Sequence, residues 1–225
     1  MKNKKMLIIG GTSSLAPEII KRSVKDFDEI VCTYRNKKNI FTNLVIWEYL
    51  DLEKDDSIKL FLNKNNKKYD KIIVLIGSVN NKKYSEMSLE SIKKYYSIYS
   101  GALLFLLQNL TTMINSTGQI IVMSSRSANN PSFDIHYSGT KSSIQAVVRS
   151  ISKFLKKDQS IVCIAPSLIL NSKMFKDMNK KNIKKHIKLS NNNLISKNEI
   201  AEFIVSLNNK ITKLINGQTI SIGNY

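Results

Sequence analysis

The sequence alternates between short apolar runs and longer amphipathic segments from one end to the other. Several short runs are apolar without the two-residue alternation of a half-exposed strand, which is typical of strands covered on both faces of a parallel sheet. The predicted strands span residues 5–10, 29–34, 44–49, 71–77, 119–124, 160–165 and 218–222. The predicted helices span residues 16–24, 55–63, 88–114, 136–156 and 197–208.

Strands that alternate with helices predict βαβ units, which build a parallel sheet with right-handed crossovers. We expect a single α/β domain over residues 1–225, with a doubly wound parallel sheet between two layers of helices, a three-layer α/β/α fold. A chain of 225 residues, 42% of them hydrophobic, can bury one substantial core, whereas two independent domains would be cramped. In such sheets, ligands bind beyond the carboxyl ends of the strands.

Two segments near the C-terminus refine this prediction. Ser196 lies just before the last predicted helix and Glu199 three residues later, a pattern typical of a capping box. Residues 173–193 are rich in asparagine and lysine, show little apolar periodicity, and follow the strand that ends at Ala165 and its loop. They form either a mobile lid over the edge of the sheet or a solvated insert, and their position favours a substrate lid.

The chain is strongly basic, with 35 Lys and Arg against 17 Asp and Glu and a formal net charge of +18. Such a charge attracts phosphate-bearing partners. The lysines are scattered with asparagine and isoleucine along the whole chain, however, and we find no basic cluster interleaved with stacking aromatics. A general compositional bias therefore explains them better than nucleic-acid binding, which we do not expect.

Apolar stretches and cysteines indicate a cytoplasmic protein without a metal site. No apolar stretch approaches the roughly 20 residues of a membrane span. The apolar run near the N-terminus is brief and merges into a glycine turn, which favours a buried first strand over a signal peptide. Cys32 and Cys163 lie inside apolar strand-like runs without metal-ligand spacing, so we expect two buried thiols in an intracellular protein.

The most informative segment spans residues 124–141. Ser124 and Ser125 end an apolar run, and Tyr137 and Lys141 follow, four residues apart. On a helix, residues at this spacing share one face, so the phenol and the ammonium can act on the same ligand. An ammonium near a phenol lowers the pKa of the phenol, and a serine hydroxyl nearby can hold a carbonyl oxygen. The segment therefore predicts a proton donor for carbonyl reduction.

Context separates this pair from a chance coincidence, because Tyr34 and Lys38 have the same spacing. Small residues lie between Tyr137 and Lys141, a long helical pattern follows them, and a strand ending in two serines precedes them. The alternative interpretation of Tyr137 and Lys141 is a helix-surface pair of little energetic value.

Residues 7–20 are typical of a strand, a tight turn and a helix. Such a turn presents backbone N–H groups and the positive end of a helix to a pyrophosphate. Gly10 and Gly11 open the turn, but Leu15 and Pro17 stand where a glycine-rich loop would continue. Alone, this segment is more often an ordinary strand-to-helix turn than a nucleotide site.

Taken in order, these residues resemble the short-chain dehydrogenase/reductase family over nearly the whole chain, and the final INGQTISI resembles its last strand. The resemblance implies a Rossmann-like fold and a nicotinamide coenzyme. It implies Ser125, Tyr137 and Lys141 as the catalytic serine and YxxxK pair, with Lys141 also holding the nicotinamide ribose. The implied coenzyme residues are Gly11, Ser13, Ser14 and Leu15 in the turn, Asp51 and Leu52 near the adenine, Gly77 after the fourth strand, Tyr137, Lys141, and Pro166 beside the nicotinamide.

The choice of catalytic serine depends on how the residues are counted. Counting forward from Gly118 places Ser125 at the family position, whereas counting back from Tyr137 slightly favours Ser124. We choose Ser125, because loop lengths vary more than strand lengths.

Three departures from the family pattern bear on function. Residues 74–77 read Val-Leu-Ile-Gly where the family has Asn-Asn-Ala-Gly. No asparagine occurs at residues 98–100, where the family usually places one that supports a water-mediated proton relay. Ser167 follows Pro166 in place of a glycine. These departures support an alternative, a catalytically impaired relative that binds a dinucleotide and acts as a regulatory protein.

The end of the second predicted strand indicates which coenzyme is used. A carboxylate there would hydrogen-bond the ribose hydroxyls of NAD, and none is present. Arg35 with Lys37 and Lys38 could instead pair with a 2′-phosphate, so NADP is favoured. The alternative is a solvated basic turn in a lysine-rich protein.

The sequence therefore predicts an NADPH-dependent oxidoreductase that reduces a carbonyl to an alcohol. Its expected partner is a small carbonyl substrate, mildly favoured to be anionic, whose identity and physiological direction stay open. The resemblance also implies a homodimer or homotetramer, packed through the predicted helices at residues 88–114 and 136–156.

Overall fold

The computed structural model describes residues 3–36, 45–79 and 84–223. Over these residues the chain forms seven β-strands, and each corresponds to a predicted strand, with some ends shifted. The strands are β1 (Lys5–Ile9), β2 (Glu29–Tyr34), β3 (Val45–Tyr49), β4 (Tyr69–Val74), β5 (Ile114–Met123), β6 (Ser160–Pro166) and β7 (Thr219–Ile222).

All seven strands are parallel and lie in the order β3-β2-β1-β4-β5-β6-β7. From β1 the chain continues outward to β2 and β3, and then crosses back so that β4 pairs with the other side of β1. The strand order therefore reverses between β1 and β4. At such a switch point the loops after the two strands diverge and leave a crevice at the carboxyl edge of the sheet.

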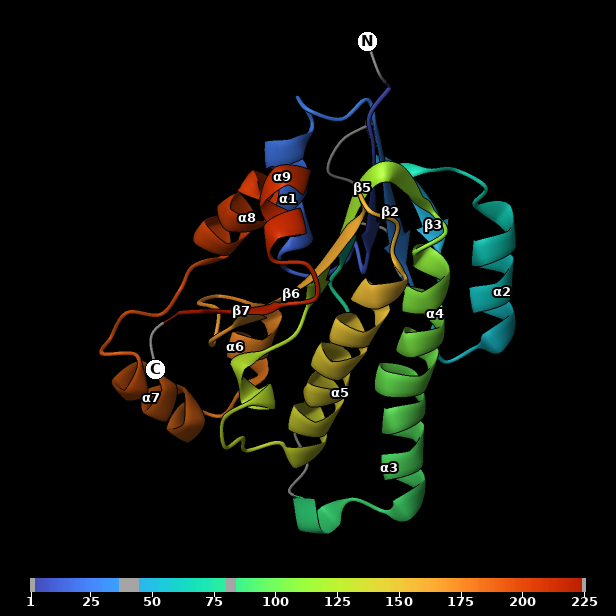
Figure 1. The fold of residues 1–225 in the computed structure, drawn as a ribbon. Coiled ribbons are helices and arrows are strands. Elements are labelled where there is room, and N and C mark those ends of the chain that lie inside the picture. The colour runs from blue at the N-terminus through green and yellow to red at the C-terminus, as the bar shows by residue number, and fades with distance from the viewer. Residues whose placement is uncertain (1–2, 37–44, 80–83, 224–225) are drawn as a thin grey trace.

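Helices cover both faces of the sheet (Figure 1). One face is covered by α2 (Asp55–Lys64), α4 (Leu103–Leu110) and α5 (Ile135–Ile151), and the other by α1 (Ala16–Ser23) and α8 (Lys197–Ser206). Alternate residues of β1 contribute to the two apolar cores, so this strand is buried on both sides. The arrangement confirms the predicted three-layer α/β/α fold.

The helix predicted at residues 88–114 is too long. It consists of α3 (Leu89–Tyr96), a π-helical turn (Ser97–Ala102) and α4, which ends at Leu110. Met113 and Ile114, the latter already in β5, are buried apolar residues. Because the end of the helix and the start of the strand are both apolar, periodicity alone does not separate them.

The segment 173–193 contains two helices that the sequence pattern did not predict, α6 (Lys173–Asp177) and α7 (Lys180–Leu189). Ser172 and Asn179 begin them, each with its side chain accepting a backbone N–H of the first turn. Their apolar faces are too narrow to stand out among the lysines and asparagines, which explains the missed helices.

Shorter elements complete the described chain. The predicted helix at residues 197–208 corresponds to α8, which ends at Ser206 and has the predicted capping box at Ser196 and Glu199. The remaining pieces are α9 (Asn209–Leu214) and the 3₁₀ turns at Tyr84–Glu86, Arg126–Ala128 and Ser152–Phe154.

Cys32 and Cys163 are free and buried, as predicted. In the part of the chain that the structure describes, no helix combines the length and apolar character needed to cross a membrane.

Lys71 is a charged residue buried inside this fold. It lies in β4 and is 6% exposed, and its Nζ donates to the carbonyl oxygens of Val205 at 3.1 Å and Leu207 at 2.9 Å. Burial lowers the pKa of Lys71 to about 8. The ammonium satisfies carbonyls at the C-terminal end of α8, where a cation is electrostatically favourable.

Replacing Lys71 by Met should lower the free energy of unfolding at pH 7 by about 1–3 kcal/mol, because the carbonyls at the end of α8 lose their donor. Urea unfolding of the wild type and Lys71→Met measures this difference, and Lys64→Met on the exposed face of α2 is the control.

The same pair of proteins tests the pKa of Lys71. The folded pKa of about 8 lies below the ordinary value of 10.5, so between these values the unfolded chain binds more protons. The wild type should therefore gain about 1–2 kcal/mol relative to Lys71→Met between about pH 7.5 and 9.5. A stability difference that shrinks as the pH rises would contradict the buried, hydrogen-bonded ammonium.

Candidate active site

The predicted catalytic pair lies in the first two turns of α5. Asp134 caps this helix, and its Oδ1 accepts the backbone N–H groups of His136 at 3.1 Å and Tyr137 at 2.9 Å. Tyr137 is 6% exposed and Lys141 3% exposed. Lys141 Nζ lies 5.7 Å from the centroid of the Tyr137 ring, so the two side chains share one face of the helix, as predicted.

Lys141 is held by the main chain of two strands. Its Nζ donates to the carbonyl oxygens of Ile76 at 2.8 Å and Met123 at 2.9 Å, which lie just beyond the end of β4 and at the end of β5. Burial lowers the pKa of Lys141 to about 8. The catalytic candidate on α5 is thus fixed directly to the carboxyl edge of the sheet.

The two candidate serines have different surroundings. Ser124 is buried, donates its Oγ–H to the carbonyl oxygen of Lys141 at 3.0 Å, and accepts from Gln145 Nε2 at 3.2 Å. Ser125 is less buried, and its Oγ accepts from the backbone N–H of Ser127 at 3.2 Å and from the Ser127 hydroxyl at 2.8 Å. Ser124 ties β5 to α5, whereas the proton of Ser125 is not used in these contacts.

The turn between β1 and α1 is closely packed on β2. Gly10 has a φ of +84°, and its N–H donates to Thr33 Oγ1 at 2.9 Å. The N–H of Gly11 donates to the carbonyl oxygen of Thr33, also at 2.9 Å. A Cβ on Gly11 would lie 2.6 Å from the Cβ of Cys32, so only glycine allows this approach of the turn to β2.

The rest of the turn is engaged within the protein. Ser13 Oγ accepts the backbone N–H groups of Leu15 and Ala16, both at 3.3 Å, at the start of α1. Ser14 Oγ accepts the backbone N–H of Lys173, the first residue of α6, at 3.2 Å. Leu15 is 7% exposed and belongs to the apolar core beneath α1, where a glycine-rich loop would present bare backbone.

Asp51 and Leu52, the predicted adenine residues, follow β3 and are buried. Asp51 Oδ1 accepts the backbone N–H of Glu53 at 3.1 Å, and the N–H of Asp51 donates to Ser57 Oγ at 2.9 Å. Asp51 therefore organises the turn into α2 through its own hydrogen bonds.

Arg35 lies at the end of β2, at the same edge of the sheet. Its Nη1 forms an ion pair with Glu53 Oε1 at 2.7 Å, and about half of its side chain is exposed (49%). Lys94 from α3 lies 3.3 Å from the other carboxylate oxygen of Glu53. Lys37 and Lys38, the other residues predicted to face a 2′-phosphate, lie outside the described residues.

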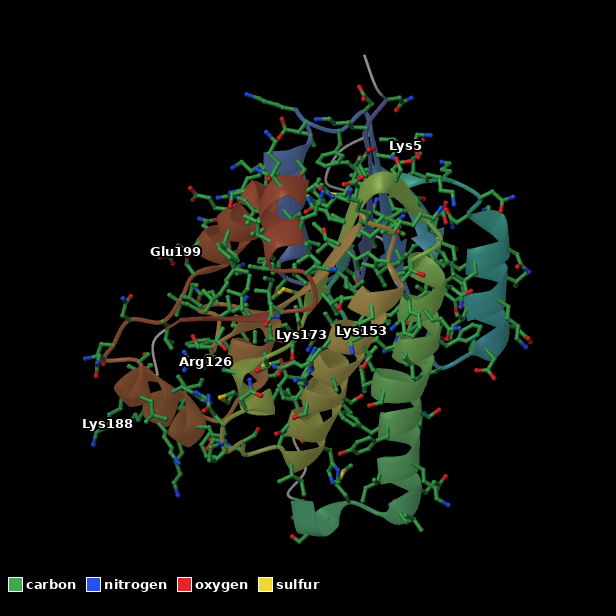
Figure 2. All side chains as sticks on the ribbon, in the orientation of Figure 1. Lys5, Arg126, Lys153, Lys173, Lys188 and Glu199 are labelled. Carbon is green, nitrogen blue, oxygen red and sulfur yellow. The ribbon has the colours of Figure 1, made fainter. Side chains whose placement is uncertain are left out.

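The segment predicted as a lid lies beside the start of α5 (Figure 1). It follows β6, whose last residue is the buried Pro166. The ring of His186 in α7 is 5.7 Å from the ring of Phe133, and Lys185 Nζ is 4.9 Å from the same ring. Burial and Lys185 lower the pKa of His186. Figure 2 shows Lys188 projecting from α7 and Lys173 on α6.

Sequence reasoning missed Thr33 and Gln145. Thr33 orients the glycine turn, and Gln145 supports Ser124 one helical turn beyond Lys141. Neither residue belongs to a motif that we recognised, because their roles come from tertiary contacts. In hindsight, the four-residue spacing of Lys141 and Gln145 was the available signal for Gln145.

A family model described as enoyl-(acyl carrier protein) reductase matches residues 12–224, which is nearly the whole chain. The chain belongs to the short-chain dehydrogenase/reductase family. It is therefore a member of a family of oxidoreductases that use a nicotinamide dinucleotide. No curated protein matches it.

Solved structures of this family have the same fold. A short-chain dehydrogenase family protein from Francisella tularensis has a TM-score of 0.84 at 17% identity, covering 97% of this chain and 96% of that one. A dehydrogenase/reductase from Sinorhizobium meliloti has a TM-score of 0.86 at 14% identity, covering 99% and 94%. BdcA in complex with NADPH has a TM-score of 0.81 at 19% identity, covering 97% and 92%.

Two features at the carboxyl edge of the sheet, beside β1 and β4, fit the family's coenzyme. Gly77 is exposed, and a Cβ on it would lie 2.7 Å from Lys141 Nζ and 3.9 Å from Tyr137 Cε2. Glycine at this position therefore lets an exposed backbone lie directly against the candidate pair of Tyr137 and Lys141. The N-terminal end of α1 lies at the same edge and presents the positive end of its dipole. Among the described residues, no cluster of His, Cys, Asp and Glu has the arrangement of a metal site.

The contacts of the two serines predict different stabilities for their alanine variants. Ser124→Ala removes two buried hydrogen bonds and should lower the free energy of unfolding by about 1–2 kcal/mol. Ser125→Ala should change it by less than about 0.5 kcal/mol. Urea unfolding of the two variants measures the difference. A greater loss of stability in Ser125→Ala would show that Ser125, and not Ser124, has the structural role.

Proposed function

We propose that the protein is an NADPH-dependent reductase that converts a carbonyl group to an alcohol. The observation that carries this proposal is the pair on α5, in which the buried ammonium of Lys141 lies against the ring of Tyr137 and beside the exposed Gly77. Membership of an oxidoreductase family supports it, and so does the position of the pair at the switch point of the sheet.

Each catalytic residue has a distinct role in the proposed reaction. The reduced nicotinamide, when bound, supplies a hydride to the carbonyl carbon. Ser125 holds the carbonyl oxygen, because its hydroxyl proton is available while that of Ser124 is used on the main chain. Tyr137 donates the proton to that oxygen, and the ammonium of Lys141 makes the phenol more acidic. By family membership, Lys141 also holds the nicotinamide ribose.

The proposed coenzyme residues surround the crevice at the carboxyl edge. The turn after β1 is proposed to receive the pyrophosphate, although Leu15 and the hydrogen bonds of Ser13 leave it less open than a glycine-rich loop. When bound, the coenzyme would be held by the turn after β3 at its adenine end, and by α5 and the end of β6 at its nicotinamide end. The proposed residues are Gly11, Ser13, Ser14, Leu15, Asp51, Leu52, Gly77, Tyr137, Lys141 and Pro166.

Arg35 supports NADPH as the coenzyme. An exposed ion pair contributes little stability, so the pairing of Arg35 with Glu53 can be exchanged for a 2′-phosphate at small cost. A guanidinium also binds phosphate through two parallel hydrogen bonds. The NADPH in the BdcA structure is consistent with this preference.

The charge of the lid favours an anionic substrate. Residues 173–189 contain seven lysines and one aspartate, and the five lysines of α7 are exposed beside the start of α5.

Acetoacetyl-coenzyme A and the same acyl group on phosphate-free N-acetylcysteamine form a matched pair of substrates. A lower KM for the coenzyme A ester would support a phosphate-bearing substrate. Crotonyl-coenzyme A belongs in the same panel, because the matching family model is described as an enoyl reductase.

The second candidate is a catalytically impaired relative that binds a dinucleotide and regulates a partner. The burial of Leu15 in the core and the absence of asparagine at residues 98–100 favour it. The retained Ser125, Tyr137 and Lys141 oppose it. NADPH binding without turnover of any ketone would support this candidate.

A homodimer or homotetramer accompanies the proposed function. By resemblance to the family, we expect the contact on the helices predicted at residues 88–114 and 136–156, and Leu104 and Phe105 of α4 are large apolar residues that are nearly half exposed. Such residues are typical of a surface covered by a second chain.

Replacing Tyr137 by Phe should lower kcat for ketone reduction by about 10²–10⁴-fold, because the proton donor is removed. NADPH binding, measured by its fluorescence, should change little. Tyr34→Phe is a matched control, since Tyr34 also has a lysine four residues later. A Tyr137→Phe variant with wild-type turnover would refute the assignment.

Replacing Arg35 by Gln should raise KM for NADPH about tenfold and leave KM for NADH nearly unchanged, because the guanidinium pairs only with the 2′-phosphate. Arg22→Gln is the control, since Arg22 also forms an ion pair, with Glu18 on α1. Steady-state kinetics with both coenzymes measures the effect. An equal effect on both would show that Arg35 does not read the phosphate.

A further inference from the structure

A group of tyrosines on α3 and on the π-helical turn after it lies in the part of the molecule that packs against α5. Tyr95 and Tyr96 belong to α3, and Tyr99 lies in the π-helical turn that follows. The rings of Tyr95 and Tyr99 are 4.7 Å apart, and those of Tyr95 and Tyr96 are 6.4 Å apart. This group occupies the part of the molecule where the family's helix asparagine is missing.

Tyr95 reaches from α3 to the turn after β4. Its hydroxyl donates to the carbonyl oxygen of Ser78, the residue after Gly77. Gly77 and Ser78 are exposed, and the carbonyl of Ile76 just before them accepts from Lys141 Nζ at 2.8 Å. Two helices therefore donate hydrogen bonds to the backbone of this turn. Lys141 of α5 donates to Ile76, and Tyr95 of α3 donates to Ser78.

Tyr95 also faces α5 directly. Tyr95 lies near Thr140, whose Oγ1 donates to the carbonyl oxygen of Tyr137 at 3.0 Å. Burial, together with Asp134, Tyr99 and Tyr137, raises the pKa of Tyr95. Its hydroxyl therefore remains a hydrogen-bond donor across the working pH range.

The turn needs such an anchor because Ser78 is the one polar side chain at residues 74–78, and within the described part of the chain its hydroxyl bonds only to the neighbouring carbonyl oxygen of Val79. The residues from the end of β4 to Gly77 read Val-Leu-Ile-Gly, so they offer only backbone groups to fix its position. The position of this turn fixes the Ile76 carbonyl. That carbonyl accepts a hydrogen bond from Lys141 Nζ and so orients Nζ beside Tyr137.

We propose that Tyr95 is a positioning residue, which fixes the Gly77–Ser78 turn and thereby holds Lys141 in place beside Tyr137. This inference rests on the reductase function proposed above. Tyr95 affects the reaction through the position of Lys141. It also fixes the backbone of Gly77, which would border the nicotinamide end of the coenzyme. It compensates in this chain for the asparagines that the turn and the π-helical segment lack.

The variant Tyr95→Phe tests this role, because it removes the hydroxyl and keeps the ring against Tyr99. We expect kcat for reduction to fall about tenfold, since a small displacement of a reacting group has a cost of this order or larger. The upper pH at which kcat falls to half should move up by about one unit, because a Lys141 that leaves its buried position regains part of its ordinary pKa. The control is Tyr99→Phe, which alters the same group of rings and should leave kcat and the pH profile unchanged.

Two further measurements separate positioning from folding and from the proposed function. The melting temperature of Tyr95→Phe should fall by less than about 5 °C, as for one hydrogen bond in a domain of this size. The Kd for NADPH, measured by fluorescence without any substrate, should rise several-fold in Tyr95→Phe and stay unchanged in Tyr99→Phe.

The outcomes are distinguishable. Wild-type turnover with an unmoved pH profile and unchanged NADPH affinity in Tyr95→Phe would overturn the positioning role alone. A wild-type protein that reduces no ketone would overturn the proposed function, and the NADPH affinities of the two variants would still test whether Tyr95 holds the turn.

Discussion

The rest of the site depends on one buried ammonium. Removing Lys141 from water is costly, and the cost is offset only because two strand-end carbonyls accept its hydrogen bonds at 2.8 and 2.9 Å. Those bonds require that β4 and β5 end side by side, that α5 begins directly above them, and that position 77 has no side chain. The geometry of the candidate site is therefore a consequence of how the sheet ends.

Most of the fold follows from local patterns in the sequence. Apolar runs within β1, β4 and β6 identify buried parallel strands, and Ser196 with Glu199 identifies the start of α8. Patterns of this kind do not reveal a boundary between two apolar elements. For this reason the predicted helix runs past the end of α4 into the first residue of β5. They are equally blind to short helices with a narrow apolar face among many lysines, as α6 and α7 are.

The candidate site was accessible to sequence reasoning only where it is local. The spacing of Tyr137 and Lys141 is a helical property, and the structure places both on one face. The distinction between Ser124 and Ser125 needed tertiary contacts, because both residues follow the end of β5, and the hydroxyl of Ser124 bonds to α5 whereas that of Ser125 bonds to Ser127. Contacts between distant segments, such as Thr33 with Gly10 and Tyr95 with Ser78, have no signature in a single sequence.

The strand at the switch point, β4, has a lysine ammonium near each end, Lys71 within the strand on the α8 side and Lys141 just beyond its carboxyl end. Both have a pKa lowered to about 8 by burial. A rise of the pH through about 8 therefore deprotonates one lysine of the scaffold and one lysine of the candidate site over the same range. Rates recorded in that range combine the titration of Lys141 with that of Lys71, which bonds the end of α8, and parallel unfolding measurements on the same samples separate the two effects.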